Sequence, residues 1–555
     1  MTRRIYNQCF LAILICVAAL PATAQSFRVQ CPTSTITHPD TTTNQMLNSA
    51  EPAYNGATQL APGANGYLVP SSNINGAIKC QQISGGDGYA TMADGTQTFM
   101  FSFGPLSGLA DIANGLPGTE FPSVFNQVYP GTLVPGDPAT TDNSSGAEAF
   151  TFNGAVGLAP DADCLAANAA ASPGTPASAL PCPNLPAGGL DGHVDPRQIM
   201  DIGVMNGNIP APLMAIDEDD EFFLTLTNVG MIMRPDLFEQ HTVHFHGYPN
   251  ASSFYDGVPD ASVAINIGGS FTYYYLAPDA GTYFWHCHIT PPEHLQMGMV
   301  GQIYVRPRQD RVPVGNSLYT ALQAQQNDLR TACNTSTDIL CSNPLPPTNN
   351  NAAQSIDPRT NQPYKYAYND GDGSTAYDVE YPIQIHGFDP NFHFVGMTFN
   401  PENFAGMKDK YFLLNGRSYP DTVTPGPMQT ETSDQNKHFS QPLPSIINIP
   451  AGGRALLRIS DLDVTEYQTL ASLGIPMHVI GINAKLLRDQ EGNNMYYDTN
   501  SITLGGGESL DLILDASDTT KYPSGSVFYL YTPNLDHLAN DAENFGGLMT
   551  EVHIN

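Results

Sequence analysis

Two short segments of the chain gather six histidines and one cysteine at spacings that suit metal binding. The first segment, 241–247, reads His-Thr-Val-His-Phe-His-Gly. The second, 285–299, begins Trp-His-Cys-His and continues to a histidine at position 294 and methionines at positions 297 and 299. Imidazole, thiolate and thioether groups in one place are typical of a site for a soft transition metal such as copper.

Strand geometry would separate these side chains into two sets. Successive side chains of a β-strand point to opposite faces, so His244 and His246 share one face, as do His286 and His288. Two such pairs on neighbouring strands would form a surface of four imidazoles. Cys287 would then point to the opposite side of its strand.

The cysteine is therefore free to join a different set of ligands. Together with His294, Met299 and an upstream histidine, Cys287 would give one thiolate, two imidazoles and a distant thioether, which is the ligand set of a blue-copper electron-transfer site. Met299 directly follows Gly298 and is preferred as the thioether, whereas Met297 is interpreted as a core residue. The stretch from 286 to 288 would be a short covalent route for electrons between the two sets.

Two other interpretations compete with this one. A lone strand histidine, a lone methionine and a buried free cysteine are usually structural residues. Zinc also binds cysteine and histidine, but structural zinc sites commonly use paired cysteines and need no methionine. The combination of all three residue types at these spacings favours copper.

Composition limits the partners of the protein. The 555 residues include 53 acidic and 21 basic ones, for a formal net charge of −32, and the basic residues form no run. Nucleic acid and anionic membrane surfaces are therefore unfavourable partners, whereas metal cations, basic small molecules and basic proteins are favoured.

The N-terminus predicts export. Residues 1–25 begin with Arg3 and Arg4, continue through an apolar stretch and end in small residues, which is the order of a secretory signal peptide. No later segment is long and apolar enough to span a bilayer. A lipoprotein signal at Cys16 is the weaker alternative, because bulky residues precede that cysteine. We expect a secreted or periplasmic protein.

Cysteine usage fits an oxidising compartment. Seven cysteines follow the signal segment, and they suggest three disulfides, namely Cys31–Cys80, Cys164–Cys182 and Cys333–Cys341. An odd number leaves one cysteine over, and that one is Cys287.

The pattern along the chain predicts an all-β protein with two β-sandwich domains. We expect an irregular N-terminal segment at 26–83, a first domain at 84–307 with a long insertion at about 105–195, a linker at 308–378 and a second domain at 379–555. The predicted strands are Tyr89–Phe103, Ala215–Asn228, His241–His246, Ser270–Leu276, Thr282–His286, Met299–Val305, Tyr381–His386, Tyr411–Asn415, Arg454–Ile459, His478–Ile482, Ser509–Leu514, Val527–Tyr531 and Leu548–Ile554.

The ligand segments and the sequence around them resemble the multicopper oxidase family of cupredoxin proteins. The supporting stretches are Asn-Gly-Asn-Ile-Pro-Ala-Pro at 206–212, Asp-Gly-Val-Pro at 256–259 and Gly-Thr-Tyr-Phe-Trp-His-Cys-His at 281–288. The likeness is close over 202–307 and fainter over 381–555. It implies Greek-key cupredoxin domains, in a two-domain arrangement with the type 1 copper site in the first domain.

The resemblance also implies a role for each candidate ligand. The type 1 copper would be held by His241, Cys287 and His294, with Met299 as the axial ligand. The remaining histidines of the two segments would face a type 2 and type 3 copper cluster where oxygen is reduced; they are His244, His246, His286 and His288.

Two departures from the family pattern affect this assignment. The interval between Cys287 and His294 is two residues longer than the common form, as in two-domain copper nitrite reductases. The second domain lacks the second set of histidine pairs, and only His478 stands in register with the family motif. The other histidines of that domain are better interpreted as structural or surface residues; they are His386, His393, His537 and His553.

The implied function is an exported oxidase that takes single electrons from a phenol or from a reduced metal ion and passes them to oxygen. The alternatives are a nitrite reductase-like type 1/type 2 copper enzyme and a non-enzymatic blue-copper electron carrier. Related nitrite reductases have an acidic residue where His244 stands here, which favours the oxidase. We expect electrons to enter at a surface edge of His294, with Glu293 as a candidate docking residue, and the resemblance suggests a homotrimer.

Overall fold

The computed structural model describes most of the chain beyond the N-terminal segment. Residues 31–126 and 206–555 are described except for gaps at 47–50, 65, 109–110, 113, 232–238, 248–251, 278, 326–343, 397–402, 432–436, 542 and 545. Between these ranges, only 158–160, 168–172, 174–176, 179 and 190–194 are described. The predicted signal peptide and the predicted pairs Cys164–Cys182 and Cys333–Cys341 lie outside the described residues.

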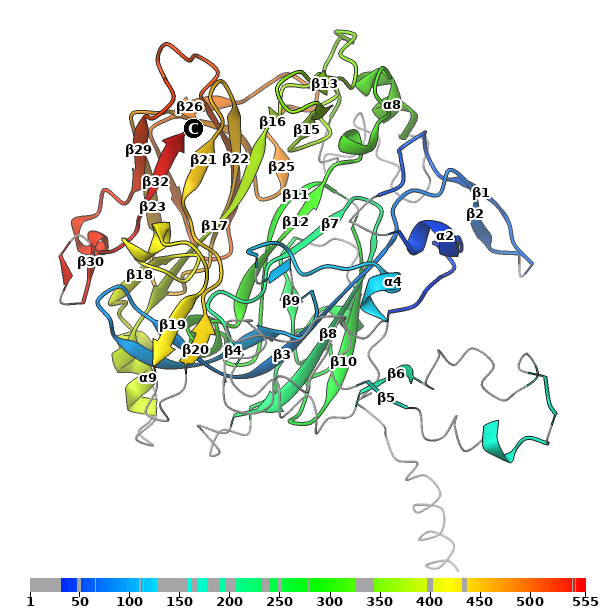
Figure 1. Ribbon diagram of the computed structural model, residues 1–555, viewed down its shortest axis with the longest axis horizontal. Coiled ribbons are helices and arrows are strands. Elements are labelled where there is room, and N and C mark those ends of the chain that lie inside the picture. The colour runs from blue at the N-terminus through cyan, green and yellow to red at the C-terminus, as the bar shows by residue number, and fades with distance from the viewer. Residues whose placement is uncertain are drawn as a thin grey trace, which may run out of the picture.

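The first sandwich packs two four-stranded sheets face to face, in the centre and lower part of Figure 1. The first sheet has the order β10-β8-β3-β4 and consists of β3 (Ile78–Thr91), β4 (Gln97–Pro105), β8 (Glu221–Gly230) and β10 (Ser270–Leu276). The second has the order β7-β12-β11-β9 and consists of β7 (Met214–Asp217), β9 (His244–Phe245), β11 (Gly281–His286) and β12 (Val300–Arg306).

The second sandwich lies beside the first, in the upper left of Figure 1. Its larger sheet has the order β18-β17-β22-β28-β24-β25 and contains β17 (Val379–Phe388), β18 (Tyr411–Leu414), β22 (Arg454–Asp461), β24 (Met477–Ile482), β25 (Lys485–Leu486) and β28 (Ser509–Asp515), with β26 (Tyr497–Thr499) paired to β24. Its smaller sheet has the order β21-β32-β29-β23-β27 and contains β21 (Ile447–Ile449), β23 (Gln468–Leu473), β27 (Ser501–Leu504), β29 (Val527–Tyr531) and β32 (Met549–Ile554).

Short elements complete the fold. The N-terminal part adds α2 (Thr41–Asn44), β1 (Gln59–Pro62), β2 (Leu68–Ser72), α4 (Pro122–Phe125), β5 (Leu158–Pro160) and β6 (Leu190–Val194). The loops of the first sandwich add η3 (Ser253–Tyr255) and α7 (Pro291–Gln296). The loops of the second add α9 (Pro390–Gly396), η5 (Phe404–Gly406), η6 (Asp421–Val423), β19 (Met428–Glu431), β20 (Lys437–Ser440), η7 (Leu535–Leu538), β30 (Ala539–Asn540) and β31 (Glu543–Asn544).

The all-β prediction is confirmed, and most predicted strands contain a strand of the structure. The predicted single strand 89–103 is a hairpin in the structure, because it includes the end of β3, the turn at 92–96 and most of β4. The prediction of an irregular segment over 26–83 is wrong at its end, because β3 begins at Ile78 and lies in the middle of the first sheet. The sequence pattern did not reveal β3 as a strand, because β3 contains Gln, Ser and Gly residues although it is buried on both faces along most of its length.

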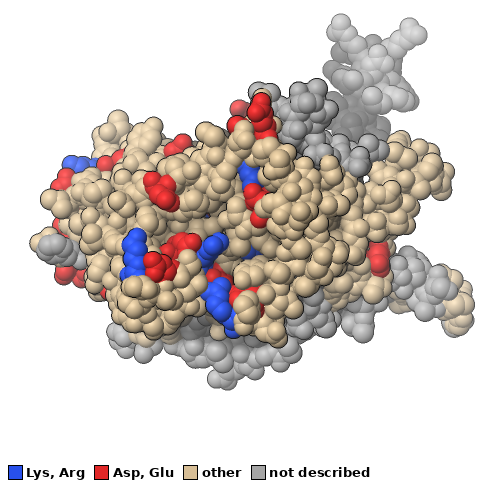
Figure 2. All heavy atoms as spheres, turned by 90° about the horizontal axis from the view of Figure 1, so that it is seen from above, with Lys and Arg blue, Asp and Glu red and all other residues tan. Residues whose placement is uncertain are grey.

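A disulfide links the N-terminal segment to this strand. Cys31 and Cys80 are bonded to each other, as the cysteine count predicted, and both are buried. None of the helices in the described residues has the length and apolarity that a membrane crossing requires. The face drawn in Figure 2 is mostly uncharged, and its few basic side chains lie next to acidic ones.

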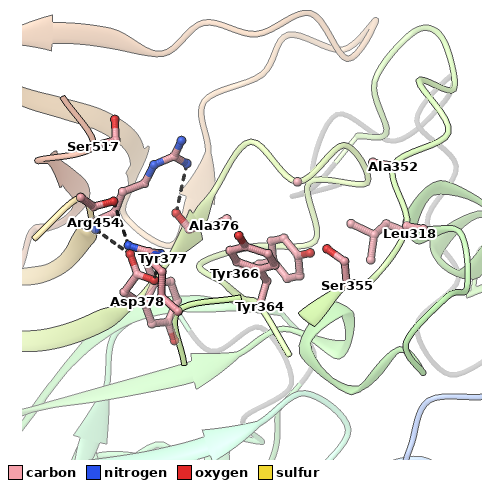
Figure 3. Close-up of a pocket in the computed structure, with 14 residues that line it drawn as sticks. Leu318, Ala352, Ser355, Tyr364, Tyr366, Ala376, Tyr377, Asp378, Arg454 and Ser517 are labelled. Carbon is pink, nitrogen blue, oxygen red and sulfur yellow. Dashed lines mark hydrogen bonds and ion pairs between the residues drawn. The ribbon is translucent and has the colours of Figure 1, made fainter. Parts of the chain in front are cut away.

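The predicted linker, 308–378, contains structure of its own: η4 (Arg308–Arg311), α8 (Leu318–Gln325) and the small strands β13 (Ile356–Asp357), β14 (Gln362–Pro363), β15 (Lys365–Tyr366) and β16 (Ala376–Tyr377). It packs on the second sandwich, where the Arg454 amide donates a 2.7 Å hydrogen bond to Asp378. A hollow of about 460 Å³ lies at this contact, with Tyr364, Tyr366 and Tyr377 in its wall (Figure 3). The hollow contains no histidine or cysteine among its lining residues.

A buried carboxylate joins the two sandwiches. Glu380 on β17 accepts a 2.8 Å bond from Arg306 on β12 and a 3.0 Å bond from Arg458 on β22. Burial opposes ionisation of Glu380, but the two guanidinium groups outweigh it and lower its pKa. The carboxylate therefore compensates the part-exposed Arg306 and the buried Arg458, whose other charged partner, Asp511, lies 3.8 Å away.

Replacing Glu380 by Gln should destabilise the protein by about 3 kcal/mol, because the buried Arg458 and the part-exposed Arg306 both lose the carboxylate that binds them. Chemical denaturation of the metal-free protein measures this. Glu491→Gln is the control, since Glu491 is exposed. An equal midpoint for Glu380→Gln and the control would contradict the role assigned to this carboxylate.

Candidate metal centres

Three predicted ligands meet inside the first sandwich. His241 precedes β9, Cys287 follows β11 and His294 lies on α7. Their ligand atoms all lie within 4.8 Å of one another, and the three side chains are buried. The distance from Cys287 Sγ to His294 Nδ1 is 3.4 Å. We call these residues the cysteine group.

The cysteine group lacks the hydrogen bonds that buried polar atoms normally make. Neither ring nitrogen of His241 has a partner, and His294 Nε2 has no hydrogen bond. Burial lowers the pKa of His294 to about 3 and raises the pKa of Cys287 to about 11. Buried imidazoles without partners are costly unless a metal uses their lone pairs, so the donor set fits a copper ion that displaces the thiol proton.

Backbone hydrogen bonds place the methionine loop against the cysteine. The Cys287 amide donates to the carbonyl of Met299 over 3.0 Å, and the Met299 amide donates to the carbonyl of His294 over 2.9 Å. Met299 and Met297 are both buried in the first core. The loop therefore holds Met299 beside the cysteine group, as an axial ligand would require.

Neighbouring strands leave little room around the cysteine group. Gly85 on β3 faces His241, and a Cβ atom at this glycine would lie 2.7 Å from the imidazole Cδ2. Phe101 contacts the edge of His294 at a centroid distance of 5.3 Å. Glycine at position 85 thus permits the close approach of β3, and the phenyl ring fixes one side of His294.

A second group forms where β9 pairs with β11. His244 and His286 lie opposite each other in the register of these strands. His246 joins them, and the ligand atoms of all three lie within 4.8 Å of one another. The ring of His288 lies against that of His244 at a centroid distance of 5.3 Å. We call these four residues the histidine group.

Hydrogen bonds orient two of these rings. His244 Nδ1 lies 2.7 Å from the carbonyl of Asp256, and His286 Nδ1 lies 2.6 Å from the carbonyl of Cys287. Each Nδ1 therefore carries the proton and leaves Nε2 with a lone pair for a metal. Nε2 of His286 is 3.0 Å from Nε2 of His246. Burial, and then the neighbouring imidazoles, lower the pKa of His246 to about 4.

A cleft of about 650 Å³ opens onto the histidine group. His246 and His286 line one side of the cleft, and the loops at 463–467 and 505–508 of the second sandwich line the other. A Cβ atom at Gly507 would lie 3.1 Å from His246 Cε1 and Nδ1. The wall that faces the histidine group is therefore made of glycine backbone and of carboxylates, which are Asp463, Glu466 and Glu508.

The structure places His478 elsewhere. It lies on β24, its Nδ1 is 2.8 Å from Asp498, and its ring contacts Tyr496. These contacts belong to the surface where β26 pairs with β24, and His478 is not among the cleft-lining residues. Its predicted place as a ligand therefore has no support in this fold.

The predicted electron entry also needs correction. His294 is completely buried, and Glu293 is nearly so. Glu239 is an acidic residue beside His294: its carboxylate lies 3.9 Å from Nε2, and its side chain is 30% exposed. Glu239 belongs to no recognisable sequence motif, so its place beside His294 is known only from the structure.

Other supporting residues were visible in the sequence without an assigned role. Three consecutive glycines at 505–507 indicated a close backbone approach, although not to which side chain. Thr242 lies between the two histidines at 241 and 244, its amide is 3.5 Å from the Cys287 sulfur, and its hydroxyl accepts a bond from the His288 amide. Thr242 thus connects the cysteine group with the histidine group.

Comparisons with known proteins agree with this geometry. Residues 192–310 match the family model described as multicopper oxidase. A laccase of Aspergillus fumigatus, abr2, is 33% identical over 109 residues, which are 19% of this chain and 17% of that protein. A copper-containing nitrite reductase of Rhizobium meliloti is 35% identical over 109 residues, 19% of this chain and 26% of the reductase. The matched region thus spans about a fifth of the length of the laccases and oxidases it resembles.

Among solved structures, a blue copper oxidase from Nitrosomonas europaea superposes with a TM-score of 0.40 and 19% identity. The superposition covers 63% of this chain and 78% of that one.

The histidine group should make the metal-free protein sensitive to acid. Because His246 and His286 have lowered pKa values, the folded state binds fewer protons than the unfolded state between about pH 6.5 and 4, so stability falls as the pH falls through this range. His286→Asn should make this dependence shallower. Denaturation at several pH values measures it, with His553→Asn on the surface as the control. Identical slopes would contradict the buried, neutral state of His286.

A side chain at Gly507 should disturb His246 alone. Gly507→Ala is expected to lower the metal content of the histidine group and to leave the cysteine group loaded, because the new methyl group meets the imidazole. Gly525→Ala is the matched control: the φ angles are +90° and +87°, but nothing lies within 4 Å of the added atom at 525. Metal analysis with absorption spectroscopy separates the groups. Equal metal loss in both variants would mean that backbone strain is responsible.

Proposed function

We propose that this chain, which carries a multicopper oxidase domain at residues 192–310, is a copper-dependent oxidoreductase that transfers electrons from a donor to oxygen. The cysteine group would hold a type 1 copper, and the histidine group would hold the copper at which oxygen is reduced. Copper bound at these groups would supply one-electron redox chemistry, which the protein side chains do not provide.

The observation that carries this proposal is the direct connection of the two groups. Cys287 belongs to the first group, while its sequence neighbours His286 and His288 belong to the second. The pairing of Trp285 with Phe245 and of His286 with His244 fixes both groups on one pair of strands. A simple electron carrier needs only the first group, so the second supports a catalytic function.

The protein shields the cysteine group and exposes the histidine group. His241, Cys287 and His294 are fully buried, which excludes water and direct ligand exchange. His246 is only partly buried and lines the cleft, so a small molecule reaches the histidine group through it. This difference suits an electron-accepting site paired with an oxygen-binding site.

The donor would approach at Glu239. This carboxylate lies between His294 and solvent, and it would attract a cation or accept a proton from a phenol. The net charge of −32 supports a metal-ion donor, and a phenolic donor fits the same carboxylate. We propose export of the protein on the basis of the signal-like segment, and a homotrimer remains part of the same hypothesis by resemblance.

A second candidate function is nitrite reduction by a type 1/type 2 copper enzyme. The match to a copper-containing nitrite reductase supports it, and so does the absence of a facing imidazole in the described wall of the cleft. One copper bound by His244, His246 and His286 would then replace a multinuclear cluster. Related nitrite reductases have an acidic proton donor at the position of His244. Because this chain has a histidine there, we favour oxygen over nitrite as the electron acceptor.

Copper content and oxygen consumption test the proposal. His246→Ala should abolish oxygen consumption and keep the blue colour, because the cysteine group is intact. His478→Ala is the control and should leave both unchanged. About four coppers per chain would indicate a complete cluster, and about two with nitrite turnover would support the second candidate. About one copper, with His246→Ala indistinguishable from the wild type, would mean an electron carrier and overturn the enzyme proposal.

A further inference from the structure

Two carboxyl groups of the second sandwich meet directly behind the wall of the cleft. Asp463 lines the cleft, and Asp409 lies next to it just before β18. A Cβ atom at Gly387 would lie 2.2 Å from Asp409 Oδ2 and 2.7 Å from Asp463 Oδ2, so both oxygens converge on this glycine.

No cation balances this pair. Neither Asp409 nor Asp463 forms an ion pair within the described residues, and both are buried. Their partners are neutral: Gln296 donates to Asp409 Oδ1 over 2.5 Å, Gln468 donates to Asp463 Oδ2 over 2.6 Å, and Thr465 contacts both carboxyl groups. Two buried carboxylates in contact, with neutral partners, are stable only if they share a proton.

The electrostatics agree with this geometry. Burial, and then the neighbouring charge of Asp463, raise the pKa of Asp409 to about 8. Two carboxylates that converge on one point repel each other when both are ionised, so one of them keeps a proton. The pair therefore holds a proton at neutral pH, as two carboxyl groups that share one site do.

We propose that Asp409 and Asp463 form a proton source for the reaction in the cleft, with Asp463 delivering the proton. This inference rests on the proposed function. Reduction of one oxygen molecule to two waters consumes four electrons, which the phenol or reduced metal ion supplies, and four protons. In each delivery the O–H bond of the pair breaks, an O–H bond to the reduced oxygen forms, and a proton from bulk solvent, carried by the water in the cleft, protonates the pair again.

The surroundings of the pair limit where its proton goes. The other titratable groups packed around it are His386, His393, Asp389, Asp461, Glu466, Glu508 and His537. His393 bonds to Gln296 Oε1, and His537 is separated from Asp463 by the Gln468 amide. An amide does not relay a proton readily. His386 interacts with the charge of Asp463, but burial lowers the pKa of His386, so this imidazole is a poor proton acceptor. The cleft is therefore the route that we assign to the proton of Asp463.

The pair also contacts the helix that carries His294. Gln296 at the end of α7 donates to Asp409 and accepts bonds from His393 Nε2 and the Asp389 amide. A purely structural pair would only hold α7 in place. The experiment must therefore separate proton delivery from the positioning of His294.

Infrared difference spectroscopy of the metal-free protein tests whether the proton is present. The wild type should show the C=O band of a protonated carboxyl group at pH 7, and this band should disappear as the pH rises above about 8. Asp409→Asn and Asp463→Asn should each remove it, and Asp498→Asn at the surface should not. Absence of the band, or its persistence in both variants, would overturn the proposal.

Kinetics of the copper-loaded protein test whether the proton is used. Asp463→Asn should slow oxygen-dependent reoxidation by about tenfold or more, without changing anaerobic reduction of the blue site by the donor. Reoxidation at the wild-type rate, or an equal slowing of both steps, would show a positioning role and overturn the proposal. If the wild type shows the band but consumes no oxygen with any donor, the proposed function itself fails, and the inference fails with it.

Discussion

The pairing of β9 with β11 is the constraint on which both metal groups depend. It sets His244 opposite His286 and Phe245 opposite Trp285, so the imidazoles gather on one face. The same alternation turns Cys287 to the other face, toward His241 and His294. A shift of one residue in this register would reverse both faces and separate every ligand from its partners.

The second sandwich shapes the site without contributing imidazoles from its described cleft wall. Its glycine loop at 505–507 packs against His246, and its carboxylates form the wall of the cleft. Gln296 links α7 to Asp409, so the same sandwich also supports the helix of the cysteine group. The chemistry of the first sandwich therefore takes place against a surface that the second provides.

The candidate ligands could be predicted from the sequence more completely than the residues that surround them. Period-two spacing around Cys287 was sufficient to separate the two groups, because side-chain direction in a strand is a local property. The motif match of His478 does not bring it to the cleft of its own chain, because similarity to a motif says nothing about which sheet edge the strand occupies. Glu239 and the pair formed by Asp409 and Asp463 depend on contacts between distant segments, and no local pattern in the chain marks them. β3 was missed because burial on both faces removes the alternation that reveals a strand.

The first hydrophobic core is not confined to the first sandwich. Phe388, Tyr411, Leu413 and Ala484 come from the second half of the chain and pack into the same core as Trp285 and Cys287. We therefore expect the two halves to unfold together as one cooperative unit. The boundary between them separates the strands of two sandwiches but does not separate two independent hydrophobic cores. The second half is for this reason indispensable to the first: removing it would open the apolar interior around the cysteine to water.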